Sequence, residues 1–168
     1  MSVSKPYRPN VGIALFNAEG RVLIGRRFRS DGPEIILPGL EWQMPQGGVD
    51  DGEDLQQAAF RELWEETGVR DASYLGETDW LTYDFPPYDE LPPHRLAKFR
   101  GQRQKWFALR FAGRDDDIDP LTPRNGQPAE FDAWRWERLD RVAGLVVPFR
   151  REVYQQVAAS FVPFAGEE

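Results

Sequence analysis

Cysteine is absent from this chain of 168 residues, and histidine occurs once. Without cysteine the protein can form neither a disulfide nor a cysteine-ligated zinc site, and a single histidine excludes a histidine-rich metal centre. No apolar run reaches the length of a membrane span. The first residues, MSVSKPYRPN, lack the apolar core of a secretory signal. We therefore expect a cytoplasmic protein with no membrane partner.

Positive charge is also scarce, because 28 Asp and Glu outnumber 21 Lys and Arg and give a formal net charge of −7. Tight binding along a nucleic acid requires the neutralisation of many phosphates, so this balance argues against broad adhesion to nucleic acid, and no DNA partner is expected. It leaves room for binding one phosphorylated end. Residues 95–105, RLAKFRGQRQK, carry five Lys and Arg and no acid, an exception in an acidic chain.

The length suits one domain over residues 1–168, and six Trp, eleven Phe and five Tyr can fill its core. Alternating or β-prone runs predict strands at 11–16, 21–26, 42–44, 73–77, 80–85, 104–111 and 131–137. The first two surround a turn at 17–20, and acidic residues 113–130 read as a loop. Apolar residues at helical spacing predict a last helix between Pro148 and Pro163. This pattern favours a mixed sheet between helices.

Three glutamates in the segment 47–69 are the most informative feature that is present. Glu62, Glu65 and Glu66 stand at i, i+3 and i+4, so a helix places them on one face. Like charges at that spacing repel by roughly a few tenths of a kcal/mol, so stability alone does not explain them. Mg²⁺ prefers oxygen ligands and takes carboxylates together with substrate phosphates. A solvated acidic face is the alternative, but the same face carries Leu55 and Ala58, which suit packing on a sheet. We favour a metal site.

Local signals delimit this helix. Asp54 is a candidate N-cap, with Gln57 three residues later as in a capping box. The helix can run to about Thr67, and Gly68 then provides a left-handed stop.

The residues before the helix also fit a binding loop. Gly47 and Gly48 let the backbone turn tightly and approach a ligand. Arg61 can reach back to Glu53, a pair for which we expect a structural role.

Counted from Gly47, the fixed positions of the segment are Gly47, Glu53, Arg61, Glu62, Leu63, Glu65, Glu66, Gly68 and Val69. This spacing resembles the signature of the Nudix hydrolases, enzymes that cleave nucleoside diphosphates linked to another moiety. The resemblance implies an α/β/α sandwich with a mixed β-sheet. It also implies a strand, loop and helix that hold Mg²⁺ or Mn²⁺ against a pyrophosphate.

Stretches outside this segment resemble one branch of that family, the bacterial RNA 5′-pyrophosphohydrolases, also described as dinucleoside polyphosphate hydrolases. They are YRPNVGI at 7–13, RRF at 26–28, WQMPQGG at 42–48, DWLTYDFP at 79–86, GQRQKWF at 101–107, EFDAWRW at 130–136 and VVPFRREVY at 146–154. The chain departs from the branch at 29–41, where its loop is longer than usual.

The resemblance assigns roles to the carboxylates. Glu62, Glu65 and Glu66 would hold the metal ions, with Glu66 the strongest candidate, and Glu130 would orient or deprotonate the attacking water. For Glu130, an exposed acid in a loop before a strand is the competing interpretation.

Recognition of the anionic end requires cations and a surface on which a base can stack. The candidates are Arg8, Arg27, Tyr83, Lys105, Phe149 and Arg150. Arg27 and Lys105 follow from the chemistry of phosphate binding, and Arg8 from the resemblance. Phe149 could stack on a base, with core packing of the last helix as an equal alternative, and Tyr83 could line the pocket or pack within its strand.

Two classes of function remain open at this point. One is a metal-dependent hydrolase that acts on the phosphorylated 5′ end of RNA and leaves a 5′-monophosphate. The other is a non-catalytic nucleotide-binding module. Within the enzyme class, the alternative substrate is a dinucleoside polyphosphate such as Ap4A or Ap5A.

Overall fold

Two long parallel strands form the centre of the sheet. The computed structural model describes residues 5–29, 36–86 and 96–166. In it, β1 (Tyr7–Phe16) lies beside β7 (Gly101–Phe111), with Tyr7 opposite Gly101 at one end and Phe16 opposite Arg110 at the other. Because side chains alternate along a strand, even-numbered residues of both strands share one face and odd-numbered residues share the other.

Shorter strands extend this pair on both sides into a mixed sheet. They are β2 (Val22–Arg27), β3 (Trp42–Gln43), β4 (Gln46–Gly48), β5 (Ala72–Glu77), β6 (Leu81–Asp84) and β8 (Phe131–Glu137). β5 and β6 pair antiparallel with β7, and β8 and β3 pair antiparallel with β2. The hairpin expected around residues 17–20 is confirmed at its base, where Phe16 lies opposite Val22. Further along, β4 occupies the edge of β1.

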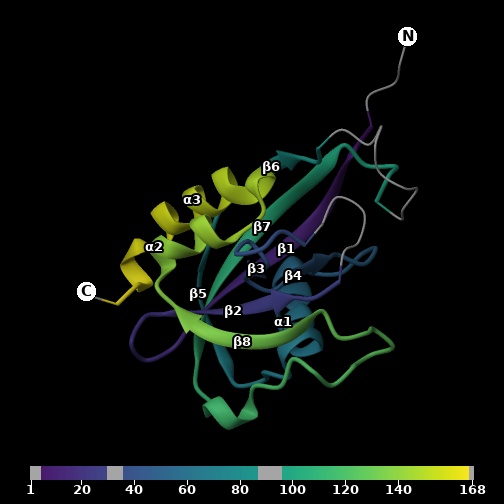
Figure 1. Cartoon of the computed structure of the whole chain (residues 1–168). Coiled ribbons are helices and arrows are strands. Elements are labelled where there is room, and N and C mark those ends of the chain that lie inside the picture. The colour runs from purple at the N-terminus through teal and green to yellow at the C-terminus, as the bar shows by residue number, and fades with distance from the viewer. Residues whose placement is uncertain (1–4, 30–35, 87–95, 167–168) are drawn as a thin grey trace.

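Helices cover both faces of the sheet, which confirms the α/β/α sandwich (Figure 1). α1 (Leu55–Thr67) lies on one face, and α2 (Leu139–Val142) and α3 (Arg151–Ser160) lie on the other. The last helix is shorter than its apolar spacing predicted, because 3₁₀ turns at 148–150 and 162–164 flank it. No helix within the described ranges is long and apolar enough to cross a membrane.

The face toward α1 is packed by the odd-numbered residues of β1. Val11, Ile13 and Leu15 are fully buried there with Ala58 and Leu63 of the helix. This packing fixes the helix against the strand and thereby sets which of its side chains point to the sheet edge.

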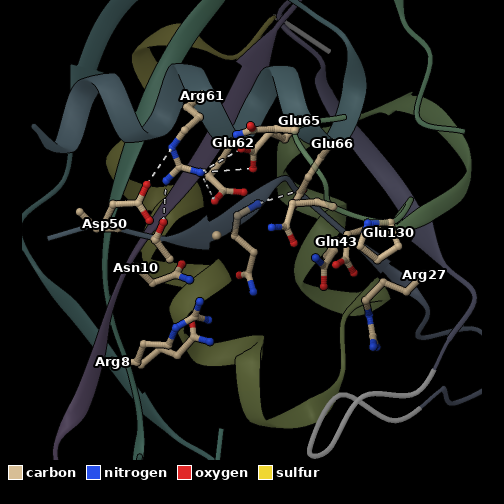
Figure 2. A pocket seen from close by; sticks show the side chains of 18 of the residues that line it. Arg8, Asn10, Arg27, Gln43, Asp50, Arg61, Glu62, Glu65, Glu66 and Glu130 are labelled. Carbon is tan, nitrogen blue, oxygen red and sulfur yellow. Dashed lines mark hydrogen bonds and ion pairs between the residues drawn. The ribbon is translucent and has the colours of Figure 1, made fainter. Parts of the chain in front are cut away.

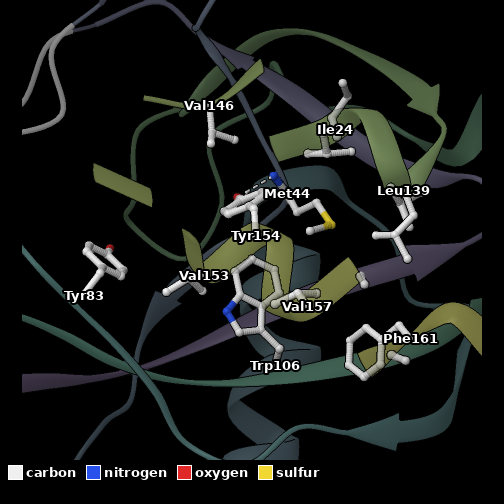
Figure 3. Packing of buried hydrophobic residues seen from close by; sticks show 14 of the residues in the cluster. Ile24, Met44, Tyr83, Trp106, Leu139, Val146, Val153, Tyr154, Val157 and Phe161 are labelled. Atoms are coloured by element: carbon white, nitrogen blue, oxygen red, sulfur yellow. Dashed lines mark hydrogen bonds between the residues drawn. The ribbon is translucent and has the colours of Figure 1, made fainter. Parts of the chain in front are cut away.

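The face toward α3 contains the largest buried side chains (Figure 3). The indole of Trp106 lies against Gly12, where a Cβ atom would come within 2.3 Å of the ring. Tyr154 of α3 meets the same indole edge to face, with ring centroids 5.3 Å apart. The Met44 N–H donates to the Tyr154 hydroxyl at 3.0 Å. The last helix therefore holds the connection between β3 and β4, the segment that leads into the glutamate helix.

The loop expected at 113–130 contains one short 3₁₀ turn, Asp115–Asp117. Its acidic residues are explained in part by the Trp136 indole N–H, which donates to Asp115 at 3.1 Å. Of the long loop expected at 29–41, residues 30–35 lie outside the described part of the chain, as does Arg95 in the basic segment.

Candidate active site

The capping signals around α1 are confirmed. The Asp54 carboxylate accepts a hydrogen bond from the Gln57 N–H at 3.0 Å, which satisfies one of the open donors at the helix start. At the other end Gly68 has φ 78° and closes the helix with a hydrogen bond to the Trp64 carbonyl. Both ends are thus fixed by local chemistry, and the glutamate face between them is held at a defined rotation.

Arg61 ties the loop to the helix, as the sequence predicted. Its guanidinium donates to both oxygens of Glu53, at 2.8 and 2.9 Å, and to the Gly48 carbonyl at 2.9 Å. The same group donates to Glu62 at 2.8 Å and to Glu65 at 3.2 Å. The hydrogen bonds from Arg61 to Glu53 lower the pKa of Glu53. One partly buried cation therefore organises the loop and offsets part of the charge of the glutamate cluster.

The three glutamates of α1 lie at the edge of the sheet and are withdrawn from solvent. Glu62 and Glu66 are 9% and 8% exposed, and Glu66 accepts a hydrogen bond from the Gln46 N–H of β4 at 3.3 Å. A Cβ atom on Gly47 would lie 2.0 Å from the carboxyl carbon of Glu62. Glycine at position 47 is therefore what allows the Glu62 carboxylate to approach the strand.

The pKa of Glu62 shows that its carboxylate is held in an unfavourable environment. Burial, followed by the charge of Glu65, raises the pKa of Glu62 to about 7, although Arg61 acts in the opposite direction. Stability does not require a carboxylate at such a site, because an apolar residue of similar size would avoid the desolvation penalty.

The donor set fits a hard divalent cation by its chemistry. Glu62, Glu65 and Glu66 offer carboxylate oxygens, the ligands that Mg²⁺ and Mn²⁺ prefer and that zinc sites seldom use alone. Among the described residues, no three acidic, histidine or cysteine side chains already converge as ligands of one ion. Two of the carboxylates form ion pairs with Arg61, so a bound cation would share their oxygens with the guanidinium.

A cavity of about 690 Å³ joins this acidic face to a basic one. Figure 2 shows the carboxylates of α1 on one side of the cavity and Arg8 and Arg27 on two other sides. Arg8 comes from β1, and its guanidinium lies so close to Gly48 that a Cβ atom there would be 2.3 Å away. Arg27, from the end of β2, is 3% exposed. A polyphosphate entering this cavity would meet guanidinium groups as well as carboxylates.

Glu130 lines the same cavity, beside Gln43 and Arg27 (Figure 2). It stands immediately before β8 and is half-buried. This position differs from that of an exposed loop acid, the competing interpretation of the sequence. Its part in water activation stays a prediction.

Four of the predicted substrate-binding residues do not line this cavity. Lys105 pairs with Glu77 at 3.0 Å on the opposite face of β7. Tyr83 and Phe149 pack on each other, with ring centroids 5.6 Å apart, as the core-packing alternative for Phe149 expected. Arg150 is 1% exposed and donates to the side chain of Gln43, which itself faces the cavity. The proposed contacts of these residues with substrate stay predictions.

Several amide side chains of the cavity wall were missed by sequence reasoning. Asn10, Gln46 and Gln102 line it from three strands. Asn125, on the acidic loop, donates to Glu65 at 2.6 Å. The three strand residues stand in stretches that resemble the family branch, but nothing in the sequence marks them as neighbours, because strand pairing or loop folding between distant parts of the chain brings all four to the site.

Comparison with known proteins gives a consistent result. The family model described as NUDIX domain matches residues 6–157. An RNA pyrophosphohydrolase of Azorhizobium caulinodans is 52% identical over 96% of this chain and 96% of its own length. An RNA pyrophosphohydrolase of Caulobacter vibrioides is 51% identical over 95% of this chain and 88% of its own length.

Solved structures agree on the fold at much lower identity. An Ap4A hydrolase of C. elegans superposes with a TM-score of 0.61 at 18% identity, covering 93% of this chain and 98% of its own. The dihydroneopterin triphosphate pyrophosphohydrolase of E. coli gives 0.61 at 19% identity, covering 93% and 99%. At such identities the likeness concerns the fold alone.

Proposed function

The chain belongs to the Nudix hydrolase family, and from this premise we propose that it acts on the 5′ end of triphosphorylated or diphosphorylated RNA. The reaction hydrolyses a phosphoanhydride bond, releases pyrophosphate or phosphate and leaves a 5′-monophosphate. The proposal is supported by relatives named RNA pyrophosphohydrolase that share about half of their residues with this chain over nearly its whole length. Every glutamate of the family signature is present in this chain, which weighs against a non-catalytic binding module.

One observation carries the proposal, namely the union of an acidic and a basic wall in a single cavity. Carboxylates alone would repel a polyphosphate, and guanidinium groups alone would bind it without activating water. A cavity of a few hundred Å³ is also the usual size for a small ligand.

The side chains of the cavity would have separate roles in the reaction. Glu62, Glu65 and Glu66 would supply oxygen ligands to a divalent cation, which we propose to be Mg²⁺ or Mn²⁺. Such a cation, when bound, polarises the phosphoryl group and lowers the pKa of water. Arg61 holds Glu62 and Glu65 and ties their helix to the loop, and Glu130 would accept the proton of the attacking water.

The arginines would act on the rest of the substrate. A guanidinium binds phosphate oxygens through two parallel N–H donors, so Arg8 and Arg27 are suited to orient the polyphosphate. Negative charge that builds on the leaving phosphate would be stabilised by the same groups. A cytoplasmic location and one domain over residues 1–168 belong to this proposal and rest on the sequence.

Turnover of matched substrates tests the assignment. Triphosphorylated RNA, diphosphorylated RNA and diadenosine polyphosphates should be compared side by side, with Mg²⁺ and with Mn²⁺. We expect the highest kcat/KM for an RNA end. A preference for diadenosine polyphosphate over every RNA end would replace the proposed substrate with the dinucleotide alternative.

Binding measurements separate end recognition from adhesion along a strand. A short 5′-triphosphorylated oligonucleotide should bind more tightly than its 5′-hydroxyl counterpart, with Ca²⁺ replacing Mg²⁺ once turnover is shown to be negligible. The affinity should fall only shallowly with salt, because an acidic protein neutralises few distant phosphates. Equal affinities for the two oligonucleotides, or a steep salt dependence, would contradict recognition of the end.

A further inference from the structure

A chain of buried amides runs from the core of the protein to the wall of the cavity. It begins at Trp106, whose indole N–H donates to Gln104 Oε1 at 3.0 Å. Gln104 Nε2 in turn donates to Asn10 Oδ1 at 2.8 Å and to Gln46 Oε1 at 2.9 Å. Trp106 and Gln104 are 0% exposed and Asn10 is 1% exposed. Gln104 does not reach the cavity, whereas Asn10 and Gln46 line it.

The chemistry of this chain fixes its polarity. An indole nitrogen can only donate, so Gln104 must present its oxygen to Trp106 and its amide nitrogen to the other side. Asn10 and Gln46 must then present their oxygens to Gln104. The N–H groups of both side chains are consequently turned away from the relay, defined here as Trp106, Gln104, Asn10 and Gln46.

The outermost donor of the relay lacks an acceptor. Asn10 Nδ2 is buried, and no hydrogen-bond acceptor in the described part of the chain lies within reach of it. Leaving a buried donor unsatisfied costs roughly 1–3 kcal/mol. Figure 2 shows Asn10 on the cavity wall between Arg8 and the carboxylates of α1. A ligand that places an acceptor atom at this point would satisfy the donor.

We propose that the relay is a positioning device that holds the amide N–H groups of Asn10 and Gln46 toward the polyphosphate of the substrate. The inference rests on the proposed function and adds to it the part of the substrate that these residues recognise. A phosphate oxygen is an acceptor without a hydrogen of its own, and Arg8, two residues from Asn10 on the same face of β1, supplies the matching positive charge. A ribose hydroxyl or a base edge can also accept a hydrogen bond, but neither carries the negative charge that Arg8 would complement.

Gln104 acts in this proposal through its neighbours. If it is replaced, Asn10 can rotate and turn its oxygen toward the cavity, where it would repel a phosphate. The polarity of the wall is therefore set by a residue that the substrate never touches.

The test uses three variants and a double variant. Asn10→Ala removes the donor, Gln104→Met breaks the relay without adding charge, and the double variant carries both changes. The control is Thr78→Val, which removes the hydroxyl that accepts the Trp106 backbone N–H at 3.1 Å on a side chain that does not line the cavity. Thermal unfolding establishes that each variant is folded.

Dissociation constants are measured for a 5′-triphosphorylated dinucleotide and for the 5′-hydroxyl dinucleotide, with Ca²⁺ present and turnover shown to be negligible. We expect Asn10→Ala and Gln104→Met each to weaken the triphosphorylated probe about tenfold, the usual effect of a lost hydrogen bond to a charged group. The double variant should lose much less than the product of the two effects, because both changes remove one interaction. Thr78→Val should stay within about twofold, and the 5′-hydroxyl probe should not respond.

Wild-type affinity in folded Gln104→Met, or a fully multiplicative double variant, would overturn the relay. A loss that is equal for both probes would move the contact from the phosphates to the nucleoside and overturn the proposed ligand. If Gln104→Met does not fold, Asn10→Ala alone decides, since unchanged binding by that variant refutes the contact. Failure of the wild type to hydrolyse any phosphorylated RNA end would instead refute the proposed function, and so the two failures are distinguishable.

Discussion

Two neighbouring stretches of the β1–β7 strand pair are equally buried but chemically opposite. In the apolar stretch Ile13 lies opposite Phe107, and both are at most 1% exposed. In the polar stretch Asn10 lies opposite Gln104, again at most 1% exposed. Burial of polar groups is unfavourable unless they form hydrogen bonds, so the polar stretch is stabilised less by its burial than the apolar stretch. The same strands thus provide stability in one stretch and, in our proposal, recognition in the other.

The largest expected effect belongs to the site. Glu66→Gln should lower kcat by roughly 100-fold or more, because it weakens a metal ligand. The free energy of unfolding should stay the same or rise slightly, since one charge leaves a cluster of like charges. Enzyme assays and urea unfolding measure the two quantities. Glu152→Gln, the same change at an exposed position of α3, is the control, and near-normal hydrolysis by Glu66→Gln would contradict the metal site.

Glu130→Gln is expected to have the next largest effect. Loss of a general base commonly costs about 100-fold, and the half-buried position of Glu130 on the cavity wall predicts little change in stability. The measurement is kcat at saturating metal. Full kcat in this variant would show that Glu130 serves as a loop acid without a catalytic part.

Two glycines of the same sheet sharpen the comparison. Gly47→Ala should lower kcat about tenfold or more with little loss of stability, because the added methyl group displaces the flexible Glu62 carboxylate. Gly12→Ala should instead lower the free energy of unfolding by about 1–3 kcal/mol, because the rigid indole of Trp106 cannot move aside.

Both variants are measured by enzyme assay and by urea unfolding, and Gly144→Ala, where a Cβ atom meets nothing within 4 Å, is the control. If Gly12→Ala left stability intact but abolished activity, the assignment of stability to the apolar stretch would fail.

The smallest effect is expected at the start of α1. Asp54→Ala removes the N-cap hydrogen bond to Gln57 and should lower the free energy of unfolding by about 1 kcal/mol. Thermal unfolding measures this change, with Asp116→Ala in the exposed 3₁₀ turn as the neutral reference. A shift no larger than that of the reference would mean that packing, not capping, fixes the helix start.

Sequence reasoning succeeded where the chemistry is local. The limits of α1 follow from Asp54 and Gly68, and the contact of Arg61 with Glu53 spans eight positions. Such features depend on neighbours in the chain, and the chain itself displays them. The mixed sheet and its covering helices could be predicted for the same reason, since strands and helices differ in the period of their apolar residues.

Sequence reasoning failed where distant strands meet. The strand expected at 104–111 begins three residues earlier, at Gly101. The sequence did not indicate these first residues, because they show no apolar alternation. Their partners are the first residues of β1, which show no apolar alternation either, and only the pairing of the two strands reveals the amide relay. Charge alone favours Lys105 as a phosphate ligand, but alternation along β7 turns its side chain away from Gln104 and the cavity and toward Glu77.

The parallel pairing of β1 with β7 also has a consequence for how the protein is made. The apolar residues of β1 leave the ribosome before those of β7, which follows about 95 residues later. At a synthesis rate of about 5–20 residues per second, the first strand waits roughly 5–20 s for its principal neighbour. During that interval the run from Val11 to Phe16 is an exposed apolar segment on the nascent chain, of the kind that chaperones bind.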